Sequence, residues 1–170
     1  MPSKKMEKAL NKQINAEMYS AYLYAAMGAH FDSENLDGFA NWMKAQAHEE
    51  MTHAMKFYAY IVETGGRVVF EAIEKPPVNF GKPEKIFDEV LKHERKVTKL
   101  INGLVALARD ENDYATENFL QWFVAEQVEE EATADDILQK VKMIGEHPNG
   151  LFMMNAQLGQ RGAGAAQSGH

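Results

Sequence analysis

Residues 119–131 read FLQWFVAEQVEEE. Steps of three and four residues along a helix over this stretch would align the side chains of Phe119, Phe123, Gln127 and Glu130. This face starts with aromatic groups and then carries an amide and a carboxyl group where a packed core is expected. A buried carboxylate is costly unless it is paired or bound to a cation. The stretch therefore predicts a core helix that carries polar chemistry near its middle.

Three further segments repeat this interrupted pattern. Apolar periodicity predicts helices over about residues 4–30, 36–64, 83–109 and 114–144. Near the middle of each helix, ionisable groups break the apolar stripe, namely Glu17, Glu50 with His53, Glu94, and Glu130. Four helices of one bundle that break their pattern at mid-length would bring these groups to one level of the core.

The connections between these segments predict their arrangement. A short link joins the first and second helices, and another joins the third and fourth, which predicts two antiparallel hairpins. The link over about residues 67–82 reaches at most ~55 Å when extended, whereas a helix of about 27 residues is ~40 Å long. This link can therefore run the length of the bundle. We expect an all-α fold, a four-helix bundle with a long crossover between the second and third helices.

The C-terminal end is expected to hold one more short element. Gly145 and Pro148 mark the end of the fourth helix, and a fifth helix is expected over about residues 150–158. Residues 1–158 would then form a single domain. The Gly/Ala/Ser-rich residues 159–170 are expected to form a mobile tail.

Composition narrows the classes of function. The chain has 170 residues, with 18 Lys and Arg against 25 Asp and Glu, and a formal net charge of −7. This balance argues against binding to nucleic acid or to an anionic membrane surface and suits a cationic partner. Because there is no cysteine, any metal must be held by carboxylate, imidazole, amide or water. No apolar run approaches the ~20 residues of a membrane span, and the N-terminus lacks an apolar signal core, so we expect a cytoplasmic protein.

The polar layer predicts a metal centre. Four carboxyl groups at one level would repel one another unless a cation neutralised them. His53 lies three residues after Glu50 and faces the same way on its helix. Oxygen-rich coordination with one imidazole suits iron or manganese better than structural zinc. Each residue alone has an ordinary explanation as a solvated helix position, and it is the agreement of phase and depth across four helices that favours the metal centre.

Further acidic side chains accompany this layer. Glu49 lies on the second helix, and Glu126 and Glu129 lie on the fourth. They form either a third cation site or an acidic surface that faces a cavity or solvent. Tyr24 lies on the inward stripe of the first helix, where it would hydrogen-bond a ligand, donate an electron or pack in the core.

Three stretches carry a resemblance to a known family. They are residues 11–17 (NKQINAE), 49–54 (EEMTHA) and 119–131 (FLQWFVAEQVEEE). Over about residues 4–160 the chain resembles the non-haem ferritins of bacteria and archaea, which are ferritin-like four-helix bundles. The resemblance implies iron storage and detoxification, in which a ferroxidase centre within each subunit oxidises Fe(II) to Fe(III). The product is then stored as a ferric mineral inside a hollow shell.

The resemblance also implies ligands for two iron ions. The first iron would be held by Glu17, Glu50 and His53. Glu50 would bridge to the second iron, which would be held by Glu94 and Glu130.

Other matching residues would support this centre. A third, adjoining iron site would consist of Glu49, Glu126, Glu129 and Glu130. Gln127 would lie beside the iron pair as a hydrogen-bonding or water-positioning group, and Tyr24 matches the tyrosine beside the centre in the family.

Differences from related families exclude haem from the expected cofactors, and the resemblance implies an oligomeric assembly. Haem-containing bacterioferritins and di-iron oxygenases carry a second E-x-x-H motif where this chain has Gln127 and Glu130, so no haem is expected. Ferritins assemble as homo-oligomers, usually of twenty-four subunits, and the short fifth helix fits their extra helix near the fourfold axis. The expected partners are Fe(II) and O2 or peroxide. Two other interpretations stay open, a di-iron oxidase that acts on an organic substrate without a storage cage and a structural bundle without metal.

Overall fold

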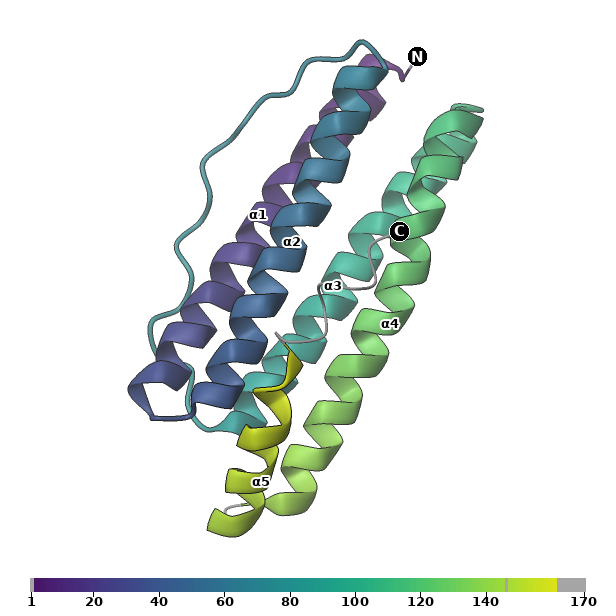
Figure 1. Cartoon of the computed structure of the whole chain (residues 1–170). Coiled ribbons are helices and arrows are strands. Elements are labelled where there is room, and N and C mark those ends of the chain that lie inside the picture. Colours follow the sequence, from purple (N-terminus) through teal and green to yellow (C-terminus); the bar gives the residue numbers. More distant parts are fainter. Residues whose placement is uncertain (1, 146, 162–170) are drawn as a thin grey trace.

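Four long helices form where the inward stripes run without an internal proline. The computed structural model describes residues 2–145 and 147–161. Its helices are α1 (Lys4–Ser33), α2 (Asp37–Glu63), α3 (Pro83–Asp110), α4 (Tyr114–Ile144) and α5 (Pro148–Leu158). Helices α1 and α2 form one antiparallel pair and α3 and α4 another, while the shorter α5 lies at one end of the bundle (Figure 1). The predicted all-α bundle with a long crossover is confirmed.

The helix bounds differ from the predicted ones by more than one residue at two places, each for a local reason. Helix α1 continues three residues beyond the predicted end, until Asn35 adopts a left-handed φ of 59° and the Leu36 N–H donates to the Phe31 carbonyl over 3.0 Å. This is the hydrogen bond of a helix-ending Schellman turn. Helix α5 begins at Pro148, two residues earlier than expected, because proline suits the first position of a helix.

The helix beginnings are capped in different ways. The Ser3 hydroxyl accepts from the Met6 N–H over 3.0 Å at the start of α1, as its sequence position predicts. Helix α2 has no side-chain cap of its own. Its first N–H groups, on Gly38 and Phe39, donate instead to the Asn155 side-chain oxygen of α5, over 2.8 and 3.2 Å. The start of α2 and the middle of α5 therefore stabilise each other.

The crossover between α2 and α3 runs along the outside of the first hairpin (Figure 1). Asn11 holds it there, because its amide nitrogen donates to the Arg67 carbonyl over 3.0 Å and its oxygen accepts from the Val69 N–H over 2.7 Å. Asn15 donates to the Ala72 carbonyl over 3.1 Å one turn further along. The stretch of residues 11–17 thus fixes the crossover with one face while its other face points into the bundle.

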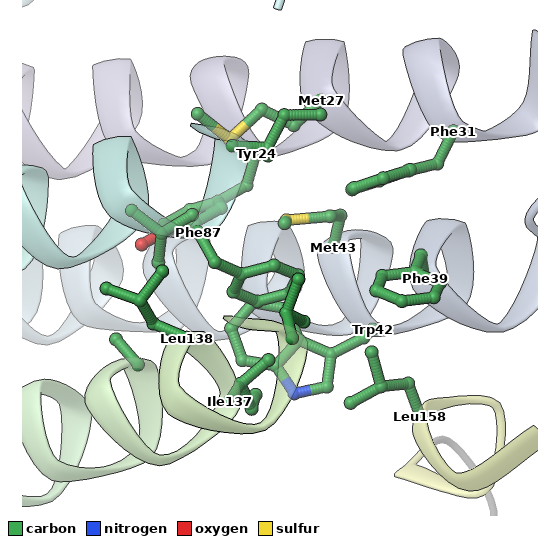
Figure 2. Close-up of a cluster of buried hydrophobic side chains, with 14 of the residues drawn as sticks. Tyr24, Met27, Phe31, Phe39, Trp42, Met43, Phe87, Ile137, Leu138 and Leu158 are labelled. Atoms are coloured by element: carbon green, nitrogen blue, oxygen red, sulfur yellow. The ribbon is translucent and has the colours of Figure 1, made fainter. Parts of the chain in front are cut away.

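The apolar core is divided into two clusters. One surrounds Tyr24, Phe31, Phe39 and Phe87 toward the α5 end (Figure 2). The other contains residues from the opposite end of each helix, among them Leu10, Phe57, Ile101 and Phe123. The polar positions predicted from the broken stripes fall between these two clusters. Packing on both sides therefore holds the polar layer in place.

The predicted inward stripes are buried with two exceptions. Phe119 and Ile144, at the two ends of the α4 stripe, are only half-buried. Leu120 and Leu138 are also buried on α4. A stripe drawn at fixed steps over 31 residues drifts relative to the core, and the ends of a long helix show this first.

The sequence predicts a mobile C-terminal tail and no membrane span. Of the predicted mobile tail, residues 159–161 are described and lie against α2, while residues 162–170 lie outside the described part of the chain. No described helix combines the length and the apolar character needed to cross a membrane.

Candidate metal centre

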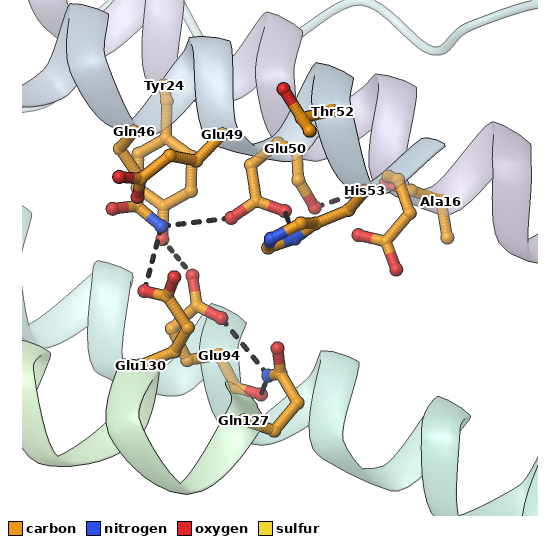
Figure 3. A network of polar contacts seen from close by, with 12 residues as sticks. Ala16, Tyr24, Gln46, Glu49, Glu50, Thr52, His53, Glu94, Gln127 and Glu130 are labelled. Atoms are coloured by element: carbon orange, nitrogen blue, oxygen red, sulfur yellow. Dashed lines mark hydrogen bonds and ion pairs between the residues drawn. The ribbon is translucent and has the colours of Figure 1, made fainter. Parts of the chain in front are cut away.

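Five ionisable side chains from all four long helices lie in the layer between the two apolar clusters. Figure 3 shows Glu50, His53, Glu94 and Glu130 in this layer. All five are nearly inaccessible, with exposed fractions of 1% for Glu17, 2% for Glu50, 4% for His53, 2% for Glu94 and 7% for Glu130. These are the residues at which the sequence pattern breaks. The structure therefore brings the five predicted groups to one level, as expected from their helical phase.

The α1–α2 side of the layer forms the tighter group. Ligand atoms of Glu17, Glu50 and His53 all lie within 4.8 Å of one another. His53 Nδ1 lies 3.4 Å from the second carboxylate oxygen (Oε2) of Glu50. Gln13 donates to Glu17 Oε1 over 2.8 Å, while Glu17 Oε2 is buried without a hydrogen-bond partner. An orphaned carboxylate oxygen beside a second carboxylate and an imidazole fits a divalent cation that accepts oxygen and nitrogen ligands.

The α3–α4 side is held by neutral donors. Tyr24 Oη donates a short hydrogen bond to Glu94 Oε1. Gln127 Nε2 donates to Glu94 Oε2 over 3.2 Å, so this amide contacts a carboxylate of the layer. Gln46 Nε2 donates to Glu130 Oε2 over 2.8 Å and to Glu50 Oε1 over 3.0 Å. The Gln46 amide therefore links the carboxyl groups of α2 and α4.

Two of these supporting groups had no role assigned from the sequence. Gln13 and Gln46 each lie four residues before a buried glutamate, Glu17 and Glu50, and each donates to it. Residues four apart are neighbours on a helix surface. The signal that could have found them is this repeated spacing of an amide ahead of a buried carboxylate. Beside the layer, His93 Nε2 contacts the Ser20 hydroxyl at 2.8 Å.

Burial sets unusual proton affinities in the layer. It raises the pKa of Glu94 to about 7 and that of Glu130 to about 8, with help from the negative charge of neighbouring carboxylates. Burial, followed by the charge of Glu50, also raises the pKa of Glu17 well above its ordinary range. Without a cation, this layer therefore holds protons that ordinary glutamates lose well below neutral pH.

Glu50 and His53 behave as an ion pair within this layer. Burial alone would raise the pKa of Glu50, but the hydrogen bond and positive charge of His53 outweigh it and lower that pKa. Burial would likewise lower the pKa of His53, and Glu50 reverses this and raises it. A metal ion that binds Nδ1 would compete with a proton for this atom.

The additional acids lie at the edge of the layer. Glu49 and Glu126 are half-buried and Glu129 is exposed. Burial raises the pKa of Glu126, while Glu49 accepts from Arg161 over 2.6 Å. Within the described residues, the group whose ligand atoms approach within 4.8 Å of one another is that of Glu17, Glu50 and His53. Neither the edge acids nor Glu94 and Glu130 join this group.

Comparison with known proteins places this architecture in a family. The family model of the ferritin-like domain matches residues 7–144. A bacterial non-heme ferritin of Bacteroides fragilis is 47% identical over 161 residues, which cover 95% of this chain and 100% of that protein. A bacterial non-heme ferritin of Campylobacter jejuni is 44% identical over 90% of this chain and 92% of its own length. The crystal structure of an open pore ferritin from Archaeoglobus fulgidus aligns with a TM-score of 0.93 and 52% identity, over 95% of this chain and 99% of that one.

Proposed function

This chain belongs to the ferritin family and serves in iron storage, and from that premise we propose that its buried polar layer is the ferroxidase centre. The proposed ligands of the first iron are Glu17, Glu50 and His53. Those of the second are Glu50, Glu94 and Glu130, with Glu50 between the two ions. Tyr24 and Gln127 hold the Glu94 carboxylate in position.

One observation carries this proposal: four buried glutamates from four helices share one layer with one buried histidine. Four carboxylates carry four negative charges, and two Fe(II) ions carry four positive charges. Two ions with a neutral His53 therefore give a layer without net charge. An uncompensated charge of either sign at this depth would be strongly unfavourable.

The reaction proposed for this layer is the oxidation of Fe(II), and the charge balance accounts for the binding of the two ions. Two Fe(II) ions replace the protons that the layer holds when it is empty of metal, and each ion then gives up one electron. With O2 as the acceptor, the electron pair and two protons convert O2 to hydrogen peroxide, and two Fe(III) ions remain. Glu126 and Glu129, at the edge of the layer, would form with Glu49 and Glu130 a third cation site.

The storage role requires an assembly larger than one chain. We propose a cytoplasmic homo-oligomeric shell, of twenty-four subunits as in the ferritins that the sequence resembles. Helix α5 projects from the end of the bundle (Figure 1) and exposes Phe152 and Met153, which are 75% and 72% accessible in the isolated chain. Such exposed apolar groups favour burial against neighbouring subunits.

The oxidase interpretation has less support. An enzyme that oxidises an organic substrate needs a cavity at the metal centre. A cavity of about 970 Å³ lies at the α5 end of the bundle, and its lining includes Phe31 and Leu151 but none of the five layer residues. A smaller cavity of about 300 Å³ is lined by Gln127 and Val128 beside the layer, and it too touches none of the five. No specific feature of the described residues favours this alternative.

The decisive experiment combines variants with iron loading. We expect Glu50→Ala and His53→Ala to slow aerobic Fe(II) oxidation on the order of a hundredfold, because each removes a ligand that positions the reacting ions. The His48→Ala variant is a matched control, since His48 is exposed on the same helix. Equal oxidation rates in the wild type and both ligand variants would refute the centre.

Storage is tested separately by loading the metal-free protein with a large excess of Fe(II) in air and measuring iron in the protein peak after size exclusion. Soluble iron far beyond the number of ligand sites, on a large assembly, is the expected result. Uptake that stops at the ligand sites on a small oligomer would refute the storage shell and favour the oxidase interpretation.

A further inference from the structure

The chain turns back onto α2 after α5 ends. Asn155 is already bound to the start of α2, and the Gly159 carbonyl accepts from the Asn41 side chain over 3.1 Å. Arg161 follows and lies against α2 near the middle of the bundle. Its guanidinium lies 4.4 Å from the centre of the Trp42 ring and donates to Glu49 Oε2 over 2.6 Å.

The contact of Arg161 with Trp42 and Glu49 is partly buried and uses both sides of the guanidinium chemistry. Trp42 is 3% exposed, so the surface under the guanidinium belongs to the core. The Arg161 side chain is 21% and that of Glu49 is 36% accessible, which shields their ion pair from much of the solvent. An arginine that stacks on an aromatic ring while it pairs with a carboxylate uses both recognition modes of its guanidinium.

The contact with Arg161 bears on the metal centre because of where the Glu49 side chain points. Glu49 adjoins the proposed ligand Glu50 in the sequence, and its side chain points toward Gln46 and away from His53 (Figure 3). In this position the Glu49 carboxylate pairs with the guanidinium of Arg161, a cation from the same chain. Glu126 lies close enough for the negative charges of Glu129 and Glu49 both to raise its pKa.

We propose that Arg161 is a built-in competitor for the third cation site, so that a metal ion binds Glu49 only when the guanidinium leaves. This inference rests on the proposed third site and adds its regulation. The guanidinium and the metal ion carry the same sign of charge and need the same carboxylate, so the two cannot be bound at close contact without strong repulsion. Arg161 therefore lowers the affinity of the third site, whereas the affinities of the two inner sites change little because Arg161 contacts none of their proposed ligands.

The test measures Zn²⁺ binding to the metal-free full-length protein by isothermal titration calorimetry. Zn²⁺ accepts the same ligands as Fe(II) without being oxidised. We expect Arg161→Gln to tighten the weakest Zn²⁺ step about fivefold, the effect of losing one partly exposed ion pair. The two tighter steps should keep their affinities. Arg161→Lys, which retains the charge, should remain close to the wild type.

A matched control separates competition from general loss of charge. Arg109 donates to Glu117 over 2.6 Å at the far end of α3, so Arg109→Gln removes a similar ion pair away from the centre. It should leave every Zn²⁺ step unchanged.

The outcomes distinguish the two proposals. Equal third-step affinities in the wild type and Arg161→Gln would overturn the role of Arg161 while the third site stands. An Arg161→Lys variant that behaves like Arg161→Gln would overturn competition between charges. If neither the wild type nor Arg161→Gln binds a third Zn²⁺ ion, the third site is refuted and the role of Arg161 with it, although the two inner sites stand.

Discussion

Replacing Glu130 by glutamine should stabilise the metal-free protein while it impairs iron oxidation. Glu130 is 7% exposed, and burial followed by the charges of Glu94 and Glu50 raises its pKa from 4.5 to about 8. At pH 7 the folded protein must therefore keep a proton on Glu130 that the unfolded chain releases. A glutamine side chain has nearly the same shape, carries no charge, and can still accept from the Gln46 amide through its oxygen.

The pKa shift sets the size and the sign of this effect. A folded-state pKa above the unfolded value gives a stability contribution that is present below pH 4.5 and is lost as the pH rises toward 8. At pH 7 the loss is about 3–4 kcal/mol, at about 1.4 kcal/mol for each pH unit between 4.5 and 7. This value is an upper limit, because the neighbouring carboxyl groups share the same protons. Glu130→Gln should thus gain nothing near pH 4.5 and up to this amount at pH 7.

Denaturant unfolding of the metal-free proteins at several pH values measures the effect, at equal protein concentration and in the presence of a chelator. The exposed neighbour Glu129 provides the control, since Glu129→Gln should change stability little at any pH. With Fe(II) or Zn²⁺ present the order should reverse, because only the wild type gains the binding free energy of the second ion. A difference in unfolding free energy between Glu130→Gln and the wild type that does not change between pH 4.5 and 8 would refute this account of the buried layer.

Other consequences can be checked with simple variants. Binding of Zn²⁺ should release protons at pH 6.5 and release fewer at pH 9, because the pKa of Glu94 is about 7. Titration of the released acid measures the number of protons. Equal release at the two pH values would contradict the conclusion that the metal-free layer holds protonated carboxyl groups. Tyr24→Phe removes a hydrogen bond that lowers the pKa of Glu94, so Fe(II) oxidation should slow several-fold at pH 6.5 and recover as the pH is raised, whereas a loss that does not depend on pH would point to packing alone. Gly38→Ala should cost about 1–3 kcal/mol, because the added carbon would lie 1.7 Å from the main-chain oxygen of Asn155. Thermal unfolding measures this cost, and Gly103→Ala, whose added carbon meets no atom within 4 Å, should instead stabilise α3 by about 0.5–1 kcal/mol.

The positions of the five buried layer residues could be predicted from the sequence, whereas those of the acids beside them, Glu49, Glu126 and Glu129, could not. Glu17, Glu50, His53, Glu94 and Glu130 interrupt apolar stripes, and the helical period alone places them at the same depth. The acids beside them have no such constraint, since each lies at the boundary between the core and solvent. Whether they approach one another depends on side-chain rotamers and on what else contacts them.

The sequence by itself determined the four long helices, the crossover and the level of the polar layer. These follow from local rules, because a helix period of 3.6 residues fixes which side chains face inward and the length of a link limits which helices it can join. The amides of Gln13 and Gln46 also follow a local rule, because each lies four residues before the glutamate to which it donates.

Only the tertiary structure decided which partners meet across the bundle. Gln46 joins Glu50 to Glu130, although 84 residues separate Gln46 from Glu130 in the chain. Asn155 caps α2 from 117 residues away, and Arg161 reaches Glu49 across 112. These contacts depend on the rotation and spacing of packed helices, and no local period in the sequence encodes those quantities.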